Sequence, residues 1–243
     1  MLSEVLFDGD ELCLKPRLSR RALCSAAAVL MMPASALPAV AGQTTATAAK
    51  ANLTVVFFPG FETIDAMGPV EMLGNLADSM RFVSLDGGIV KSAQGVPVMT
   101  EKFVSEDPVR ILLVPGAAPQ VLPKEKAFFE AGKAAAQKAE YVLTVCTGSF
   151  LVAQTGLLKG RKATSNKKAL PMVMKRVPDV NWQKKARRVA DGKFYTSSGI
   201  TAGMDMALGF IADRYGENEA RRIAAFTEYR RSADPADDPF TAG

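Results

Sequence analysis

The chain has 243 residues, of which 48% are hydrophobic and 23% are charged, a composition typical of globular proteins and not of disordered or fibrous ones. Its formal net charge is +5, but the densest basic clusters, 161–168 and 184–188, contain no interleaved aromatic residues and no helix-turn-helix pattern. We therefore expect no binding to nucleic acid.

Residues 1–41 have the pattern of a signal peptide. Basic residues that include Arg20 and Arg21 precede an apolar run, and small residues follow up to Ala41. The apolar run is too short to span a bilayer, and the paired arginines resemble the twin-arginine export signal. We expect cleavage after Ala41, with Ala36 as the second choice, and a periplasmic or secreted protein without stable membrane insertion. An uncleaved helix or membrane anchor is the alternative interpretation.

Cleavage changes what the cysteines can do. Cys13 and Cys24 lie in the segment that we expect to be removed, so Cys146 is the one thiol expected in the mature chain. An internal disulfide is then excluded. An unpaired thiol in an oxidising compartment is a liability unless it is buried or used, and this singles out Cys146.

After a Thr/Ala-rich linker, expected at 42–52, short β-branched runs alternate with longer helical patterns, which is typical of a parallel sheet covered by helices. Strands are expected at 53–58, 81–85, in a ribbon within 87–100, at 111–114, 141–145 and 163–166, and in a hairpin of 187–190 with 193–196. Helices are expected at 65–77, 124–138, 147–155, 167–176, 201–215 and 217–229. The sequence predicts one α/β domain over 53–229, with a peripheral tail at 230–243.

Cys146 stands between the apolar strand predicted at 141–145 and the helix that follows, with Gly148 beyond it. A nucleophile on a sharp strand-to-helix turn forms a nucleophile elbow, here with cysteine in place of serine. Unpaired N–H groups at a helix N-terminus stabilise a thiolate, so we expect a lowered pKa for the Cys146 thiol. A buried structural cysteine is the alternative, but the carboxyl end of a parallel strand is where α/β proteins bind ligands.

The chain contains no histidine, which excludes every Cys–His mechanism. Asp65, at the start of the helix after the first strand, is the best-placed group to accept and donate protons. Capping of that helix would explain an aspartate there equally well. Glu71, on the same helix, is a more ambiguous candidate. We expect neither a metal nor a cofactor.

Several sequence blocks resemble a known superfamily. They are Asp65-x-x-Gly68-Pro69-x-Glu71, Leu112-Leu113-Val114-Pro115-Gly116, Val145-Cys146-Thr147-Gly148-Ser149-Phe150-Leu151, and the segments 156–164 and 191–205. In this order they resemble the ThiJ/PfpI superfamily, whose fold is of the class I glutamine amidotransferase type, over about residues 53–229. Within it they are most similar to isonitrile hydratases and to the sensor domains of AraC-type regulators, whose DNA-binding domain we do not expect here.

The resemblance implies a flavodoxin-like three-layer sandwich, a homodimer and a small-molecule substrate. It implies that Cys146 attacks the terminal carbon of R–N≡C, that Asp65 is the acid and base, and that Thr147 offers its backbone N–H beside the reacting atoms. Hydrolysis of the resulting thioimidate releases an N-substituted formamide. The substrate contacts that we expect are Gly116, Ala117, Gly148, Asn166 and Thr201.

Asn166 marks a departure from many members of the superfamily. They carry histidine in an Ala-Thr-Thr-His run after the cysteine, where 163–166 reads Ala-Thr-Ser-Asn. Asparagine forms hydrogen bonds but does not titrate, which weakens peptidase, amidotransferase and histidine-assisted glyoxalase interpretations. Two alternatives to a hydratase stay open: a non-catalytic redox or ligand-sensing protein with an oxidisable thiol, and a glyoxalase or deglycase with a different proton relay.

Overall fold

An eight-stranded sheet forms the centre of residues 51–104, 107–236 and 238–241, which are the residues that the computed structural model describes. The predicted signal peptide and most of the predicted linker lie outside them. In spatial order the strands are β3 (Gly88–Lys91), β4 (Pro97–Lys102), β2 (Ala77–Ser84), β1 (Ala51–Val56), β5 (Ile111–Val114), β6 (Tyr141–Thr144), β10 (Phe194–Ser197) and β9 (Arg188–Asp191). Pairing is parallel except between β3 and β4 and between β9 and β10, at the two edges.

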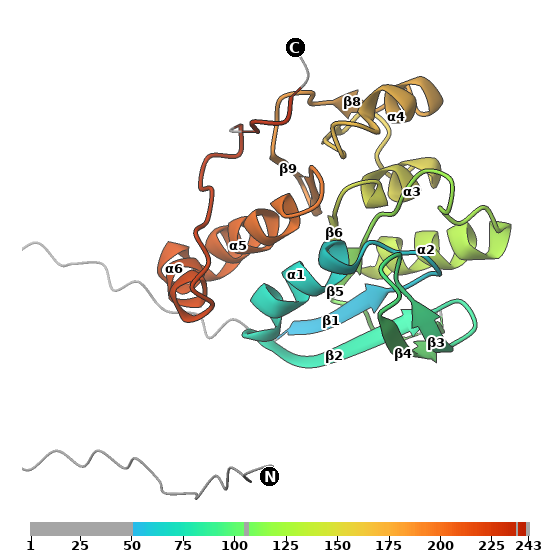
Figure 1. Cartoon of the computed structure of the whole chain (residues 1–243), viewed down its shortest axis with the longest axis horizontal. Coiled ribbons are helices and arrows are strands. Elements are labelled where there is room, and N and C mark those ends of the chain that lie inside the picture. Colours follow the sequence, from blue (N-terminus) through green and yellow to red (C-terminus); the bar gives the residue numbers. More distant parts are fainter. Residues whose placement is uncertain (1–50, 105–106, 237, 242–243) are drawn as a thin grey trace, which may run out of the picture. The chain divides into compact units, whose positions relative to one another are not determined.

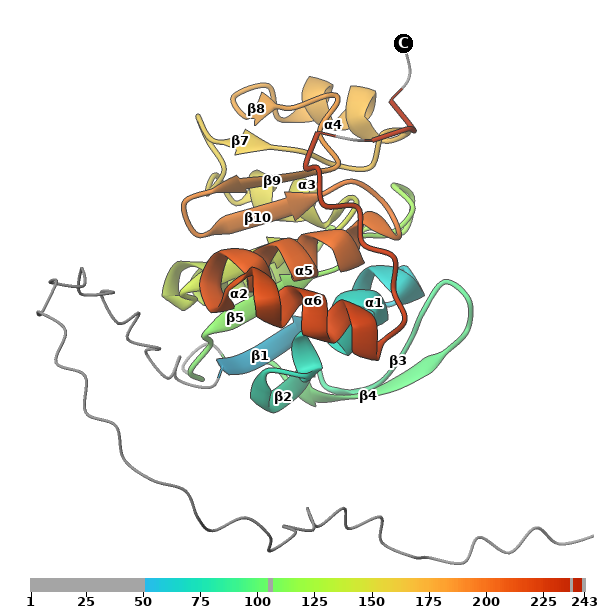
Figure 2. The same cartoon turned by 90° about the vertical axis from the view of Figure 1, so that its left-hand side faces the viewer.

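Helices cover both faces of the sheet. One face carries α1 (Thr63–Gly74), α5 (Ala202–Tyr215) and α6 (Glu217–Phe226), and the other carries α2 (Lys126–Lys138) and α3 (Gly148–Gln154) (Figures 1 and 2). This arrangement confirms the predicted α/β sandwich with a mostly parallel sheet. None of the helices in the described part of the chain is both long and apolar enough to cross a membrane.

Beyond the β9 edge lies a smaller unit, made of α4 (Leu170–Arg176) and a two-stranded sheet of β7 (Lys162–Ala163) and β8 (Asn181–Trp182) (Figure 2). The predicted strand 163–166 ends early because the backbone N–H of Thr164 bonds to the side-chain hydroxyl of Thr196 and not to a backbone carbonyl. The predicted helix 167–176 starts three residues late, after a turn in which Asn166 binds the N–H of Ala169.

The two central strands bring the site residues to one edge of the sheet. All four residues of β5 are buried, as the fully apolar run at 111–114 predicts. In the register of β5 with β6, Val114 lies opposite Thr144. The chain therefore leaves both strands side by side at their carboxyl ends, with Gly116 following β5 and Cys146 following β6.

The C-terminal segment is bound more closely than its predicted peripheral position suggests. Pro235 accepts a hydrogen bond from the backbone N–H of Arg187 at 2.8 Å, and the Arg188 guanidinium donates to the carbonyls of Ser232 and Ala233. In Figures 1 and 2 the segment runs from α6 past β9 towards α4. It connects elements that are far apart in the sequence.

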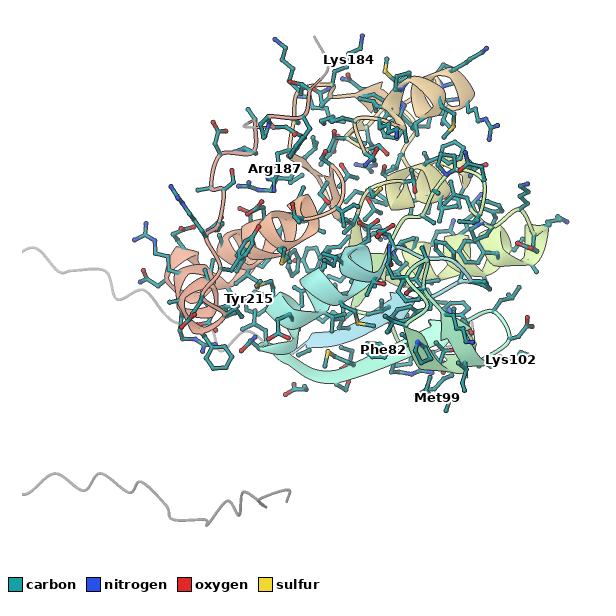
Figure 3. All side chains as sticks on the ribbon, in the orientation of Figure 1. Phe82, Met99, Lys102, Lys184, Arg187 and Tyr215 are labelled. Carbon is teal, nitrogen blue, oxygen red and sulfur yellow. The ribbon has the colours of Figure 1, made fainter. Side chains whose placement is uncertain are left out.

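A buried and an exposed methionine allow the contribution of the core to stability to be tested. Met206 in α5 is fully buried, whereas Met99 on β4, labelled in Figure 3, is 70% exposed. We expect Met206→Ala to lower the free energy of unfolding by about 2–5 kcal/mol, because it leaves a cavity in the core. Met99→Ala should change it by less than about 0.5 kcal/mol. Urea unfolding of both variants measures the difference, and equal losses would contradict this account of the core.

Candidate active site

Cys146 occupies a sharp turn between β6 and α3. Its backbone φ is +57°, in the left-handed region that non-glycine residues rarely adopt. Three hydrogen bonds hold it there: its N–H donates to the Ser198 carbonyl at 3.2 Å, and its carbonyl accepts the hydroxyls of Ser149 at 3.0 Å and Ser165 at 2.9 Å. The predicted elbow is therefore present, and its backbone polar groups are paired.

Gly199 lies directly against the thiol. A Cβ atom at this position would be 3.2 Å from the Cys146 sulfur and 2.3 Å from Nδ2 of Asn166, so only glycine leaves room for both. Gly199 lies within the motif block 191–205 but was not among the predicted site residues. Ser149, Ser165 and Ser198 were missed in the same way, although each belongs to a motif block or lies within one or two residues of one.

Asp65 is buried beside this turn and does not cap its own helix. It is the third residue of α1, whose N-cap position is held by Glu62. Its Oδ2 accepts the backbone N–H of Gly116 at 3.0 Å, while Oδ1 has no hydrogen-bond partner among the described residues. The capping interpretation of Asp65 is thus wrong, because its carboxyl reaches across to the end of β5.

Burial decides the charge state of this pair. Desolvation raises the pKa of Asp65 from 3.8 to about 8, with a smaller contribution from the charge of Glu62, and the Gly116 N–H and the hydrogen-bonding neighbour Cys146 act in the opposite direction. Desolvation also raises the pKa of the Cys146 thiol well above its ordinary value, and repulsion by the Asp65 carboxylate raises it further. At neutral pH the site therefore holds a carboxylic acid beside a thiol.

The expectation of a lowered thiol pKa is wrong for this structure. The Thr147 N–H at the start of α3 does lower the pKa of Cys146, as the elbow argument requires, but burial and Asp65 outweigh it. Cys146 is only 6% exposed and Asp65 is fully buried. A short helix of seven residues cannot offset the loss of solvation on this scale.

Thr147 joins the elbow to the loop after β5. Its hydroxyl donates to the Ala117 carbonyl at 2.7 Å and accepts the Ala117 N–H at 2.9 Å, so that both capacities are used. Gly116 lies so close that a Cβ there would be 2.5 Å from the Thr147 nitrogen. The Thr147 side chain therefore holds the two strand ends together, and its backbone N–H acts on the sulfur.

A pocket of about 400 Å³ opens over Cys146. Of the predicted site residues it is lined by Cys146, Thr147, Ala117 and Asn166; its other lining residues are Glu62, Ala118, Pro119, Gln120, Lys168, Ala169 and Ile200. The remaining predicted contacts lie elsewhere. The N–H of Gly116 donates to the Asp65 carboxyl group. Gly148 packs against the end of β5, where a Cβ atom would be 2.2 Å from the Val114 carbonyl oxygen. Thr201 is exposed at the start of α5.

Asn166 presents a hydrogen-bond donor beside the thiol. Its Oδ1 accepts the N–H of Ala169 at 3.1 Å, which turns Nδ2 towards Gly199 and the pocket. The position thus supplies an N–H donor and no titratable group. Glu71 is exposed on α1 and takes no part in the site.

The raised pKa of Asp65 has a measurable consequence for stability. The folded protein retains a proton on Asp65 between its unfolded pKa of 3.8 and its folded pKa of about 8, so the stabilisation that this group contributes is complete below the lower value and is lost as pH rises. The titration of Asp65 should lower the free energy of unfolding by about 1.4 kcal/mol per pH unit across that range. We expect Asp65→Asn to gain stability relative to the unmodified protein as pH rises through this range.

Denaturant unfolding at a series of pH values measures this difference. Glu71→Gln, a carboxylate-to-amide change on the exposed side of the same helix, should follow the unmodified protein at every pH. A constant difference between Asp65→Asn and the unmodified protein would show that Asp65 is ionised in the folded state.

Several known proteins are similar to this chain in sequence. Isonitrile hydratase from Pseudomonas putida is 31% identical over 194 residues, which make up 77% of this chain and 80% of that protein. The HTH-type transcriptional regulator GbdR of Pseudomonas aeruginosa is 27% identical over 179 residues, but these cover only 48% of the regulator. The chain thus spans about half of GbdR and most of the hydratase.

Solved structures of similar fold point to the same family as these relatives. A THiJ/PfpI family protein from Pseudomonas syringae matches with a TM-score of 0.66 and 26% identity over 86% of each chain. Drosophila melanogaster DJ-1beta, at 17% identity and a TM-score of 0.66, shares the fold over 74% of this chain and 99% of its own. The family model described as DJ-1/PfpI matches residues 51–213. These similarities confirm the resemblance that the motif blocks predict, and the chain belongs to the DJ-1/PfpI family.

Proposed function

We propose that this protein is a cysteine-dependent enzyme that hydrates isonitriles, R–N≡C, to N-substituted formamides. The observation that carries the proposal is the buried Asp65–Cys146 pair in a chain without histidine. A carboxylic acid with a pKa of about 8 is a proton donor near neutral pH, where an ordinary aspartate is not. The similarity to isonitrile hydratase over most of both chains supports the same reaction.

In the first half of the reaction, the carboxylic acid of Asp65 protonates the terminal carbon of the isonitrile. The Asp65 carboxylate then takes the thiol proton of Cys146, and the sulfur adds to the same carbon to give the thioimidate R–N=CH–S–Cys146. The raised pKa of the thiol is no obstacle, because the proton leaves during the attack and passes to an adjacent base. No free charge has to be held in the buried site before substrate arrives.

In the second half, water adds to the C=N bond. Asp65 transfers its proton to the nitrogen and accepts one from the water, which gives R–NH–CH(OH)–S–Cys146. Loss of the thiol with return of the hydroxyl proton to sulfur releases R–NH–CHO and restores both groups. Thr147 and Asn166 line the pocket together with Cys146, and the Thr147 N–H and the Asn166 Nδ2 are the donors proposed for the oxygen as it gains charge.

The lining of the pocket suits a small organic molecule. Ala117, Ala118, Pro119 and Ile200 provide apolar walls, and Glu62 and Lys168 are its charged lining residues. An isonitrile is neutral and linear, so its reactive carbon can reach a thiol that is only 6% exposed. The pocket's apolar walls are then left for the substituent on nitrogen.

The raised pKa of the Cys146 thiol argues against the redox-sensing alternative. Peroxides oxidise the thiolate, and the raised pKa of Cys146 keeps the thiol protonated at neutral pH. A glyoxalase or deglycase reaction needs a base for its carbonyl substrate, whereas Asp65 is held in its acid form. Stepwise oxygen addition at Cys146 after mild peroxide, or lactate formed from methylglyoxal, would favour these alternatives.

We expect the mature protein to convert a simple alkyl isonitrile to its formamide. Cys146→Ala removes the nucleophile and Asp65→Asn the proton donor, so each should reduce turnover by at least about 100-fold. Glu71→Gln serves as the matched control and should keep full turnover. In the unmodified protein kcat/KM should fall as pH rises through about 8, because the acid form of Asp65 disappears. Formamide production at the rate of the Cys146→Ala variant would contradict the proposal.

We also propose that the chain is exported by the twin-arginine route, is cleaved after Ala41, and acts as a homodimer in the periplasm or outside the cell. The pattern of residues 1–41 supports export. Changing Arg20 and Arg21 together to lysine should leave the uncleaved precursor inside the cell, as fractionation and the mass of the product would show. Unchanged export of the double-lysine variant would contradict this route.

A further inference from the structure

A buried ion pair lies outside the pocket. Arg187, labelled in Figure 3, is 8% exposed, and its partner Asp205 in the first turn of α5 is 1% exposed. Both Nε and an Nη atom of Arg187 lie 2.6 Å from Oδ2 of Asp205. The two charges are therefore paired within the protein, away from solvent.

The C-terminal segment completes the surroundings of this pair. Oδ1 of Asp205 accepts the backbone N–H of Ser232 at 2.8 Å, and the backbone N–H of Arg187 donates to Pro235 at 2.8 Å. Tyr229 also contacts Asp205, and burial together with that carboxylate raises the pKa of Tyr229 to about 12. The pair thus joins three parts of the chain: the start of β9, the first turn of α5 and residues 229–235.

Two routes of direct contact lead from the pair to the elbow. The Arg187 carbonyl accepts the N–H of Ser198 at 2.8 Å, and the Ser198 carbonyl accepts the N–H of Cys146 at 3.2 Å. On the side of Asp205, Gly203 in the same helical turn packs against Val145, with 2.9 Å between an added Cβ and the valine side chain. Through these contacts the pair supports Ser198 and Val145, the two residues that flank the turn presenting the thiol.

Stability alone is a weak reason for such a pair. Removing two charges from water costs several kcal/mol per ion, and uncharged side chains of similar size often fold as well or better. Neither Arg187 nor Asp205 lines the pocket over Cys146. Arg187 instead contacts the segment 198–203 at Ser198, and Asp205 follows that segment in α5; the segment faces the sulfur through Gly199.

We propose that Arg187 and Asp205 form a positioning pair, which fixes the segment 198–203 and so holds the Cys146 thiol in its buried, reactive orientation. The inference rests on the proposed hydratase function for its turnover readout, but its readout on the thiol does not depend on any substrate. Both residues act through Ser198 and α5 and do not touch the reacting atoms.

Two variants separate positioning from folding. Arg187→Met combined with Asp205→Asn removes both charges and keeps an amide oxygen for the Ser232 N–H. Arg187→Lys keeps the charge, and so the fold, but loses the paired N–H contacts to one oxygen. Glu140→Gln is the control, because it breaks the Arg110–Glu140 ion pair before β5 and β6, at the opposite end of the sheet.

The thiol is followed by its alkylation with iodoacetamide as a function of pH, on protein shown by circular dichroism to be folded. Loosening of the segment 198–203 should expose the thiol and bring its pKa down, and a fall of one unit raises alkylation about tenfold at a pH below the pKa. We expect a rise of at least about threefold in the double variant and a smaller rise in Arg187→Lys. Turnover of isonitrile should fall in kcat by about tenfold, with little change in KM, because the displacement affects the reacting atoms.

The control should keep both the alkylation profile and kcat. If the double variant does not fold, the Arg187→Lys variant decides the question. An unchanged alkylation profile in the folded variants would overturn the positioning role, whatever happens to their stability. If the unmodified protein does not turn over isonitriles but the variants still shift the alkylation profile, the proposed function fails and the positioning role stands.

Discussion

The left-handed backbone of Cys146 is the constraint on which the rest of the site depends. A non-glycine residue at φ +57° costs about 1–2 kcal/mol, which local sequence alone does not return. The structure offsets this cost with hydrogen bonds between Cys146 and three serines, which lie in α3, in the loop after β7 and directly after β10. Because these bonds join different elements, the turn forms only when the whole carboxyl edge of the sheet is assembled.

That assembly buries the thiol and Asp65 together, and burial then governs their chemistry. Two effects compete at Cys146: the Thr147 N–H at the start of α3 favours the thiolate, and desolvation with the Asp65 charge disfavours it. The second effect wins, and the same desolvation keeps Asp65 protonated near neutral pH. A neutral acid beside a neutral thiol suits a substrate that must first gain a proton and is itself uncharged.

Local patterns predicted the parts of this site that lie within one element. The apolar run 111–114 is a strand with those same ends, and the strand-Cys-Thr-Gly sequence identified the elbow. Asp65 was identified from its place after the first strand. The pKa of the thiol was predicted in the wrong direction, because the helix terminus is visible in the sequence whereas the amount of protein packed around the sulfur is not.

Contacts between distant residues account for what sequence reasoning missed. Nothing local indicates that Gly199 faces the sulfur, that the carboxyl of Asp65 leaves its own helix for Gly116, or that residues 229–235 bind Arg187. Thr201 was expected at the pocket from the family resemblance, but the residue of this loop that lines the pocket is Ile200. A shift of one residue at a helix start thus decides which side chain faces a site.

The protonation state of Asp65 tests the central claim most directly. Infrared difference spectra between the unmodified protein and Asp65→Asn isolate the signal of this one carboxyl group across a pH titration. The account predicts a carboxylic acid band at neutral pH that converts to a carboxylate with a midpoint of about 8. A carboxylate band already present at neutral pH, with a midpoint near the ordinary value of 3.8, would contradict it.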